Sequence, residues 1–170
     1  MYAPNVTGSG ATGRRSGIKL TIRKLVGSGD RIVAFTLPVA IDGLALWAGD
    51  HTRFAIDGSS PAVRAAALVL LGIGLVSWAW SATLILVKVP NEELITSGPF
   101  AVVKHPLYAS VGLLVLPAAG ILLGTLLGAV IGVALYAGSR LFAPEEEREL
   151  RGTFGAAWDA YSRRVLLPWV

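Results

Sequence analysis

Long apolar segments separated by short polar ones dominate the chain from about residue 32 onward. They cover roughly residues 32–48, 62–87 and 110–141. A membrane-spanning helix needs about 20 mostly apolar residues, and a helix rises about 1.5 Å per residue, so the segment 62–87 can cross with some tilt. The pattern predicts an all-α integral membrane protein.

The third apolar segment, residues 110–141, is too long for one crossing and short for two. As one helix it would extend roughly 48 Å, against a hydrocarbon core of about 30 Å. Pro117 and the small residues 118–120 offer a break. The segment therefore predicts a hairpin of two short or tilted helices, which brings the expected number of transmembrane helices to about four.

Glycines recur at every fourth position of this hairpin, at Gly120, Gly124, Gly128 and Gly132. Such spacing places small residues on one helix face and lets another backbone approach closely. Close packing within the bundle is the first interpretation, and a homodimer face is the alternative.

The two ends of the chain differ from the apolar middle. Residues 1–31 form a Gly- and Ser-rich tail followed by a basic stretch, which predicts a disordered segment and an interfacial anchor ahead of a single membrane domain at 32–170. Pro144 and the acids 145–147 predict the start of a C-terminal helix, because acids favour the positive end of the helix dipole. Leu150, Phe154, Trp158, Tyr161 and Val165 follow at helical spacing, so this helix should be amphipathic with an aromatic stripe.

Composition and charge agree with a membrane protein. The chain is 54% hydrophobic and 15% charged, whereas soluble domains carry about a quarter charged residues. It has no cysteine, which excludes disulfides and thiolate chemistry. With four spans, every lysine and arginine except Arg53 and Arg64 falls on one side, together with both termini. The positive-inside rule assigns that side to the cytoplasm, so the net charge of +4 indicates orientation in the cytoplasmic membrane rather than a nucleic-acid partner.

The polar stretch GPFAVVKHPLY at residues 98–108 interrupts the apolar pattern. Non-helical backbone at membrane depth is tolerated only where it is buried in protein or lines a cavity. His105 and Tyr108 would lie on the same side as Glu146 and Glu147, so the two groups can meet at a site. A single histidine is more often structural, and no cluster with metal-ligand spacing is present.

One acid lies inside the first span, at Asp42. An intramembrane acid is costly and suggests a functional role. Asp42 also lies within a turn or two of the polar segment that follows the span, so the alternative interpretation is a residue that simply reaches water.

The stretch ITSGPFAVVKHPLYAS resembles the signature G-P-[YF]-x-x-x-[RK]-H-P-x-Y of the isoprenylcysteine carboxyl methyltransferase and phospholipid methyltransferase superfamily. After an apolar hairpin, that superfamily continues E-E-x-x-L-x-x-x-F-G-x-x-Y-x-x-Y-x-x-x-V. At these spacings the chain has Glu146, Glu147, Leu150, Phe154, Gly155, Trp158, Tyr161 and Val165. The resemblance covers roughly residues 95–168.

This resemblance implies a small membrane methyltransferase that uses S-adenosylmethionine (SAM), held by about residues 95–110 and 140–165. The implied cofactor-binding residues are Gly98, Pro99, Lys104, His105, Pro106, Tyr108, Glu146, Glu147, Leu150 and Tyr161. Lys104 replaces a more usual arginine and Trp158 a tyrosine. The superfamily often has an arginine shortly before the acidic pair, and Arg140 is the nearest one here. Glu146, Tyr108 and Arg140 are therefore the candidate catalytic residues.

Methyl transfer from SAM requires positioning, exclusion of water and charge stabilisation, but no metal. A carboxylate acceptor needs no base, whereas an amine or thiol must lose a proton, for which Glu146, Tyr108 and Tyr161 are candidates. The expected partners are membrane lipid and a lipophilic or small acceptor, such as the carboxylate of a prenylated cysteine or a related amphiphile, which would enter from the bilayer. A reductase-like relative with another cofactor and a non-catalytic scaffold or transporter are the alternatives.

Overall fold

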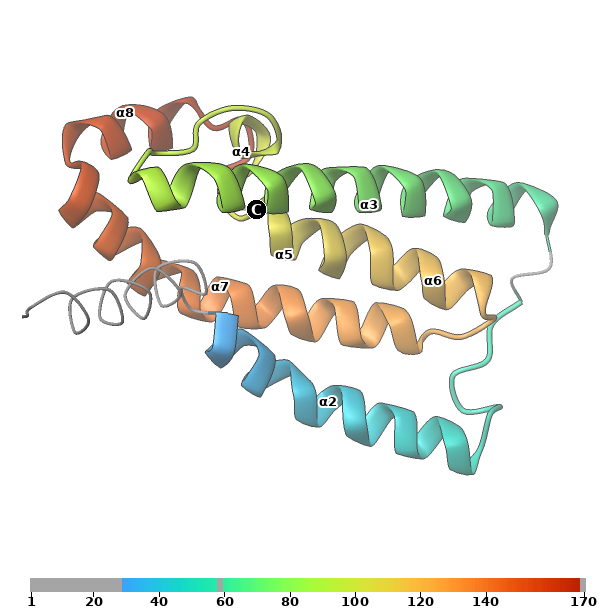
Figure 1. The fold of residues 1–170 in the computed structure, drawn as a ribbon. Coiled ribbons are helices and arrows are strands. Elements are labelled where there is room, and N and C mark those ends of the chain that lie inside the picture. The colour runs from blue at the N-terminus through green and yellow to red at the C-terminus, as the bar shows by residue number, and fades with distance from the viewer. Residues whose placement is uncertain (1–28, 58–59, 169–170) are drawn as a thin grey trace, which may run out of the picture.

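The computed structural model describes residues 29–57 and 60–168, and Figure 1 shows them as a bundle of helices. In this part of the chain, extended pairing is limited to two isolated β-bridges. The predicted tail and nearly all of the predicted interfacial anchor lie outside the described residues.

Three helices are long and apolar enough to cross a membrane, as the apolar pattern predicts. They are α2 (Gly29–Gly49), α3 (Pro61–Lys88) and α7 (Leu127–Phe154). A shorter apolar helical stretch, Pro106–Leu122, is built from α5 (Pro106–Ser110), the π-helical turn η2 (Val111–Val115) and α6 (Leu116–Leu122). The remaining elements are η1 (Val89–Asn91), α4 (Pro99–Val102) and α8 (Ala156–Arg164). The all-helical membrane class is therefore confirmed, while the count of four spans stays a prediction.

The hairpin is present, but the predicted position of its break at Pro117 and residues 118–120 is wrong. The chain reverses at residues 123–126 instead, where Gly124 has a φ of +69°. Pro117 lies in the first turn of α6, directly after the π-helical turn Val111–Val115. Proline lacks an N–H and its ring crowds the preceding turn of an α-helix, and a π-type turn is one way in which a helix continues past it.

Three of the four regularly spaced glycines, Gly120, Gly128 and Gly132, form the seam between the two arms of the hairpin, and Gly124 lies in its turn. A Cβ on Gly128 would lie 2.1 Å from the carbonyl oxygen of Leu116, and one on Gly132 would lie 2.2 Å from that of Gly112. Gly120 faces Gly128 across the same seam. These glycines are thus used for close packing within the chain. The homodimer stays a prediction, and it would need a different face.

The predicted helix start at Pro144 is also wrong. Helix α7 runs without interruption from Leu127 to Phe154, with Pro144 inside it, and ends at Gly155, whose φ is +52°. The acids 145–147 therefore lie in a helix interior, where the dipole argument does not apply. The predicted amphipathic segment is divided between the end of α7 and the short helix α8, and Figure 1 shows that the chain changes direction between them.

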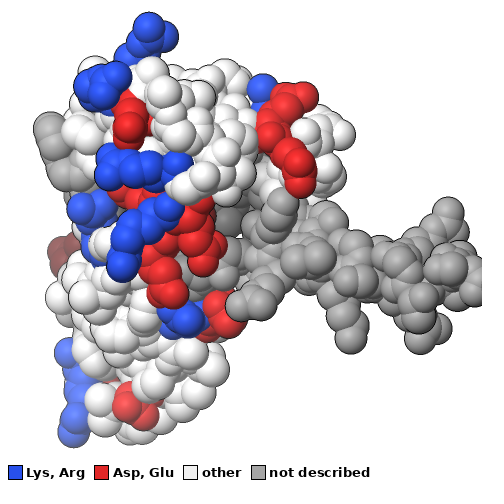
Figure 2. Space-filling view, turned by 90° about the vertical axis from the view of Figure 1, so that its left-hand side faces the viewer, with Lys and Arg blue, Asp and Glu red and all other residues white. Residues whose placement is uncertain are grey.

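Charged residues collect at one end of the bundle. This end contains the start of α2, the end of α3, the end of α7 and α8, and Figure 2 shows the basic and acidic side chains gathered on it. Arg53 and Arg64 lie at the other end, in the α2–α3 loop and the first turn of α3. There the loop is tied to the hairpin turn by two backbone hydrogen bonds, from Ile56 to Gly124 and from Leu126 to Phe54. The bundle is therefore polarised along its length.

Candidate functional site

A cavity of about 290 Å³ opens at the charged end. Small-molecule sites typically enclose roughly 300–1,000 Å³, so this cavity is near the lower end of that range. Its lining comes from the end of α3 and η1, the segment 92–95, the segment 100–108, the C-terminal part of α7, and α8. Two of these regions carry the sequence motifs that resemble the methyltransferases, so residues some 40 positions apart, such as Lys104 and Glu147, are neighbours here.

The first motif is shaped by glycine and proline and presents polar side chains to the cavity. Gly98 has a φ of +62°, and a Cβ there would come within 3.0 Å of the Trp80 ring. Pro99 and Pro106 each open a short helix, where a missing N–H is tolerated. Gly98 and Pro99 thus turn the chain ahead of the residues that line the cavity, which are Lys104, His105, Pro106 and Tyr108.

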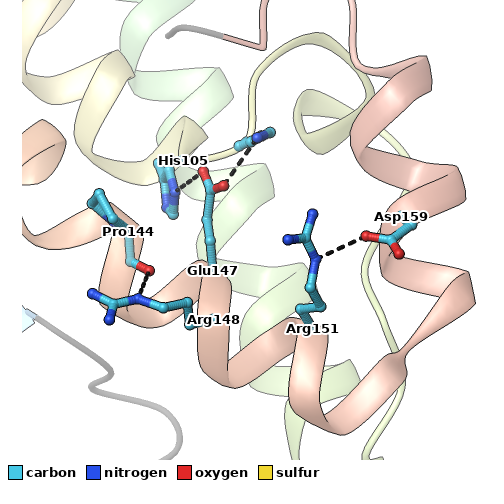
Figure 3. Close-up of polar contacts among 7 residues, drawn as sticks. His105, Pro144, Glu147, Arg148, Arg151 and Asp159 are labelled. Atoms are coloured by element: carbon cyan, nitrogen blue, oxygen red, sulfur yellow. Dashed lines mark hydrogen bonds and ion pairs between the residues drawn. The ribbon is translucent and has the colours of Figure 1, made fainter.

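The two adjacent acids of the second motif, Glu146 and Glu147, have different surroundings. Glu146 lines the cavity, and Glu147 does not. Lys104 Nζ donates a hydrogen bond of 3.0 Å to Glu147 Oε2, and His105 Nε2 lies 3.6 Å from Glu147 Oε1 (Figure 3). The side chains of Lys104 and His105 are each only 10% exposed. Glu147 therefore joins the first motif to α7.

His105 carries a buried polar atom that the protein does not satisfy. No described residue forms a hydrogen bond with its Nε2. The atom lies 3.6 Å from Glu147 Oε1, just beyond hydrogen-bond distance, so this nitrogen belongs to the cluster around the Lys104–Glu147 ion pair.

Helix α8 forms part of the cavity wall, and the residues after it bond to the first motif. Trp158 and Tyr161 line the cavity, and the Tyr161 hydroxyl donates a hydrogen bond of 2.9 Å to the carbonyl of Phe100. The backbone N–H groups of Leu166 and Leu167 donate to the carbonyls of Ala101 and Val102. Burial, with a contribution from the Glu147 charge, raises the pKa of Tyr161 to about 12. At neutral pH this phenol is therefore protonated and acts as a donor, not as a base.

The structure brings most of the predicted site residues together. Seven of the ten implied cofactor-binding residues line the cavity: Lys104, His105, Pro106, Tyr108, Glu146, Leu150 and Tyr161. Gly98, Pro99 and Glu147 are not among the lining residues. Arg140 is exposed on α7 and Asp42 is exposed on α2, and neither lines the cavity.

Sequence reasoning did not identify Glu92, Glu93, Glu149 and Thr153, which also line the cavity. Glu149 could have been found, because it lies three residues after Glu146 and so on the same helix face. Glu92 and Glu93 precede the first motif and carry no signal of their own. Among the described residues, no group of three or more histidine or acidic side chains could hold a metal ion.

The left-handed conformation of Gly98 should make this position intolerant of substitution. We expect Gly98→Ala to destabilise the protein by about 1–3 kcal/mol, because a Cβ is disfavoured at this φ and would press on the Trp80 ring. Thermal unfolding in detergent would measure the change. Gly152→Ala is the control, because a Cβ there meets nothing within 4 Å. Equal melting temperatures for the two variants would contradict the prediction.

Comparison with known proteins gives one match. The model of the isoprenylcysteine carboxyl methyltransferase (ICMT) family matches residues 60–151, which is more than half of the chain. The matched region includes α3, the hairpin, the first motif and the acidic pair. No curated protein and no solved structure matches the chain.

Proposed function

Because this chain belongs to the isoprenylcysteine carboxyl methyltransferase family, we propose that it is a SAM-dependent methyltransferase that works from the cavity at its charged end. The observation that carries the proposal is the convergence of the two motifs. Lys104, His105 and Tyr108 of the first motif and Glu146 and Leu150 of the second line the same cavity. The family membership favours this function over a reductase-like or non-catalytic protein.

The lining residues have the chemistry that SAM requires. The cofactor carries an adenine ring, ribose hydroxyls, an ammonium group and a carboxylate. Phe154 and Trp158 offer aromatic faces for the ring, and the Glu146 carboxylate can accept hydrogen bonds from hydroxyl or ammonium groups. When bound, SAM supplies an activated methyl group.

The task of the protein in such a reaction is to position the reactants and to exclude water. Orientation in a closed site can lower a barrier by roughly 7–11 kcal/mol. Trp158 and Tyr161 contribute buried side chains to the wall of the cavity and so support that task. Tyr108 and Glu146 lie on the wall, where a catalytic residue must be, whereas Arg140 is exposed and lies away from it. We therefore assign no catalytic contact to Arg140.

We further propose that the protein lies in the cytoplasmic membrane with both termini and the cavity on the cytoplasmic side. The charge distribution supports this orientation, because the described lysines and arginines other than Arg53 and Arg64 lie toward the cavity end. The segment Pro106–Leu122 would be the fourth span, shortened or tilted. The acceptor would then be a lipophilic or small molecule, and SAM would enter from the cytoplasm.

Calorimetry of SAM binding to the detergent-purified protein tests the proposal. We expect saturable binding by the wild type and an affinity lower by about tenfold or more in His105→Ala and in Glu146→Gln. Glu145→Gln is the matched control, because Glu145 is an exposed acid on the same helix that pairs with Arg31 and does not line the cavity. Absence of binding by folded wild-type protein would overturn the proposal.

A further inference from the structure

The chain after α8 runs beside the first motif as an extended segment, residues 165–167, which we call the C-terminal strand. The backbone N–H groups of Leu166 and Leu167 donate hydrogen bonds to the carbonyls of Ala101 and Val102. Figure 1 shows this end of the chain returning to α4. Two segments that are distant in the sequence therefore form one continuous surface.

The two sides of the C-terminal strand have opposite surroundings. Val165 is buried in a cluster with Trp158 and Tyr161, which line the cavity. Leu166, the next residue, is 71% exposed, and Val102 of the neighbouring segment is 43% exposed. Consecutive side chains of an extended segment point to opposite sides. One side of the strand thus supports the cavity wall, and the other presents apolar side chains outward.

Helix α3 gives the depth of this outer surface in the bilayer. The helix begins at Pro61, directly after the polar loop of the opposite end, and Trp80 follows 19 residues later, which is about 28 Å of helix. A hydrocarbon core is about 30 Å thick, so Trp80 lies near the boundary with the headgroups, where tryptophan is enriched. The Trp80 ring lies against Gly98, directly before α4, which ends at Val102. Val102 and its neighbour Leu166 therefore lie close to the same boundary.

Two arginines stand beside this apolar surface. Arg163 and Arg164 end α8, directly before the C-terminal strand, and both are exposed. Neither forms an ion pair with another residue that the structure describes. Five other basic side chains at this end contact an acidic side chain or a carbonyl of the protein: Arg31, Lys88, Lys104, Arg148 and Arg151. Arg163 and Arg164 are thus available to an anion outside the chain.

We propose that Val102, Arg163, Arg164 and Leu166 form a docking surface for anionic phospholipid. The two arginines would bind the headgroup phosphate, and the two apolar side chains would enter the hydrocarbon beside the acyl chains. A soluble acidic partner could pair with the arginines, but it would leave the depth and exposure of the apolar pair unexplained. The bound lipid lies outside the cavity and is not the methyl acceptor, so the proposal does not depend on SAM.

Lipid on this docking surface would also hold the cavity wall in place. The hydrogen bonds of Leu166 and Leu167 join the C-terminal strand to the first motif, and Val165 packs on the side chains that line the cavity. A ligand that binds only the docked strand shifts the equilibrium toward it. Anionic lipid should therefore reduce the opening of this part of the wall.

Native mass spectrometry of the detergent-purified protein tests the docking. Phosphatidylglycerol and phosphatidylcholine with the same acyl chains would be titrated separately. One arginine near an anionic surface contributes about fivefold in affinity, so we expect the wild type to bind phosphatidylglycerol at least about tenfold more tightly. Equal affinities for the two lipids would overturn the proposal.

Matched variants locate the preference. Arg163→Gln with Arg164→Gln should remove most of it, whereas Arg53→Gln with Arg64→Gln removes the same charge at the opposite end and should retain it. Each single substitution replaces the pair if the pair does not fold. A preference that survives in the folded Arg163→Gln, Arg164→Gln protein would overturn the assignment to this surface.

The apolar half of the docking surface is tested by Leu166→Ser and by inorganic phosphate. Leu166→Ser should weaken the binding of both lipids. Inorganic phosphate at the concentration of the lipid should not displace phosphatidylglycerol, because it has no acyl chains. Displacement by phosphate, or unchanged lipid affinities in Leu166→Ser, would show an anion site instead and overturn the lipid assignment.

Hydrogen exchange tests the link between the docking surface and the cavity wall. We expect the amides of Leu166 and Leu167 to exchange at least about threefold more slowly in nanodiscs that contain phosphatidylglycerol than in phosphatidylcholine alone. The Arg163→Gln, Arg164→Gln protein should show no such difference. Equal exchange rates in the wild type would overturn the link. Because none of these measurements uses SAM, a failure of the methyltransferase proposal would leave their outcome unaffected.

Discussion

Replacing Glu147 with alanine is expected to destabilise the protein by about 3 kcal/mol, at the lower end of the range for breaking a buried ion pair. The reason is the charge that it leaves behind. The Lys104 side chain is 10% exposed, and the hydrogen bond to Glu147 is the one ion pair that the described residues give its ammonium group. Glu147 is itself 26% exposed, which places the expected cost toward the lower limit. Chemical or thermal unfolding in detergent would measure it.

The same variant should also bind SAM more weakly, because Lys104 and His105 lose the group that holds them at the wall. The double variant Lys104→Met with Glu147→Ala distinguishes the two effects. Removing both charges should recover most of the stability, since no unpaired charge remains, but SAM affinity should stay low because Lys104 is lost from the lining. The control is Glu145→Ala, which breaks an exposed pair with Arg31 and should cost at most about 1 kcal/mol. If Glu147→Ala and Glu145→Ala lowered the free energy of unfolding equally, the buried pair would contribute no more to stability than the exposed one.

The long apolar helices could be predicted from the sequence because lipid imposes one simple requirement. A span needs a continuous run of apolar residues, and the predicted segments 32–48 and 62–87 fall within α2 and α3. The meeting of the two motifs followed from the same reasoning. Since a hairpin returns the chain to the side from which it started, the segments that flank it must lie at the same end of the bundle.

The details of the hairpin and of the site depended on tertiary structure. Pro117 was expected to break a helix and Pro144 to begin one, yet both lie within helical segments, and the hairpin turns instead at Gly124. Local propensity favours a break at proline, but packing along the hairpin holds the helices together past it. Glu147 and Glu146 are adjacent in sequence and face different surroundings, which only the rotation of α7 against the first motif determines. Glu92 and Glu93 reach the cavity because the chain turns sharply after η1.

The second large effect is expected at Gly128, where the two arms of the hairpin are closest. We expect Gly128→Ala to cost about 3 kcal/mol, at the upper end of the usual range for overpacking. The added Cβ would lie 2.1 Å from the carbonyl oxygen of Leu116 and 2.9 Å from the Cα of Gly120. Both contacts are with backbone atoms, so no side-chain rotation relieves them and the helices must separate. A lower unfolding temperature in detergent, relative to the wild type, is the expected result.

Gly72→Ala provides the matched control for this prediction. Gly72 lies within α3, and a Cβ there meets nothing within 4 Å, so the same substitution should be neutral or stabilising by about 0.5–1 kcal/mol through helix propensity. If Gly128→Ala were as stable as Gly72→Ala, the backbones of the hairpin would not be in contact. The outcome also bears on the site, because α5 begins at Pro106 on the cavity wall and α7 carries Glu146. Helices that separate at the seam, where Gly112 and Gly132 also meet, would move the two motifs apart.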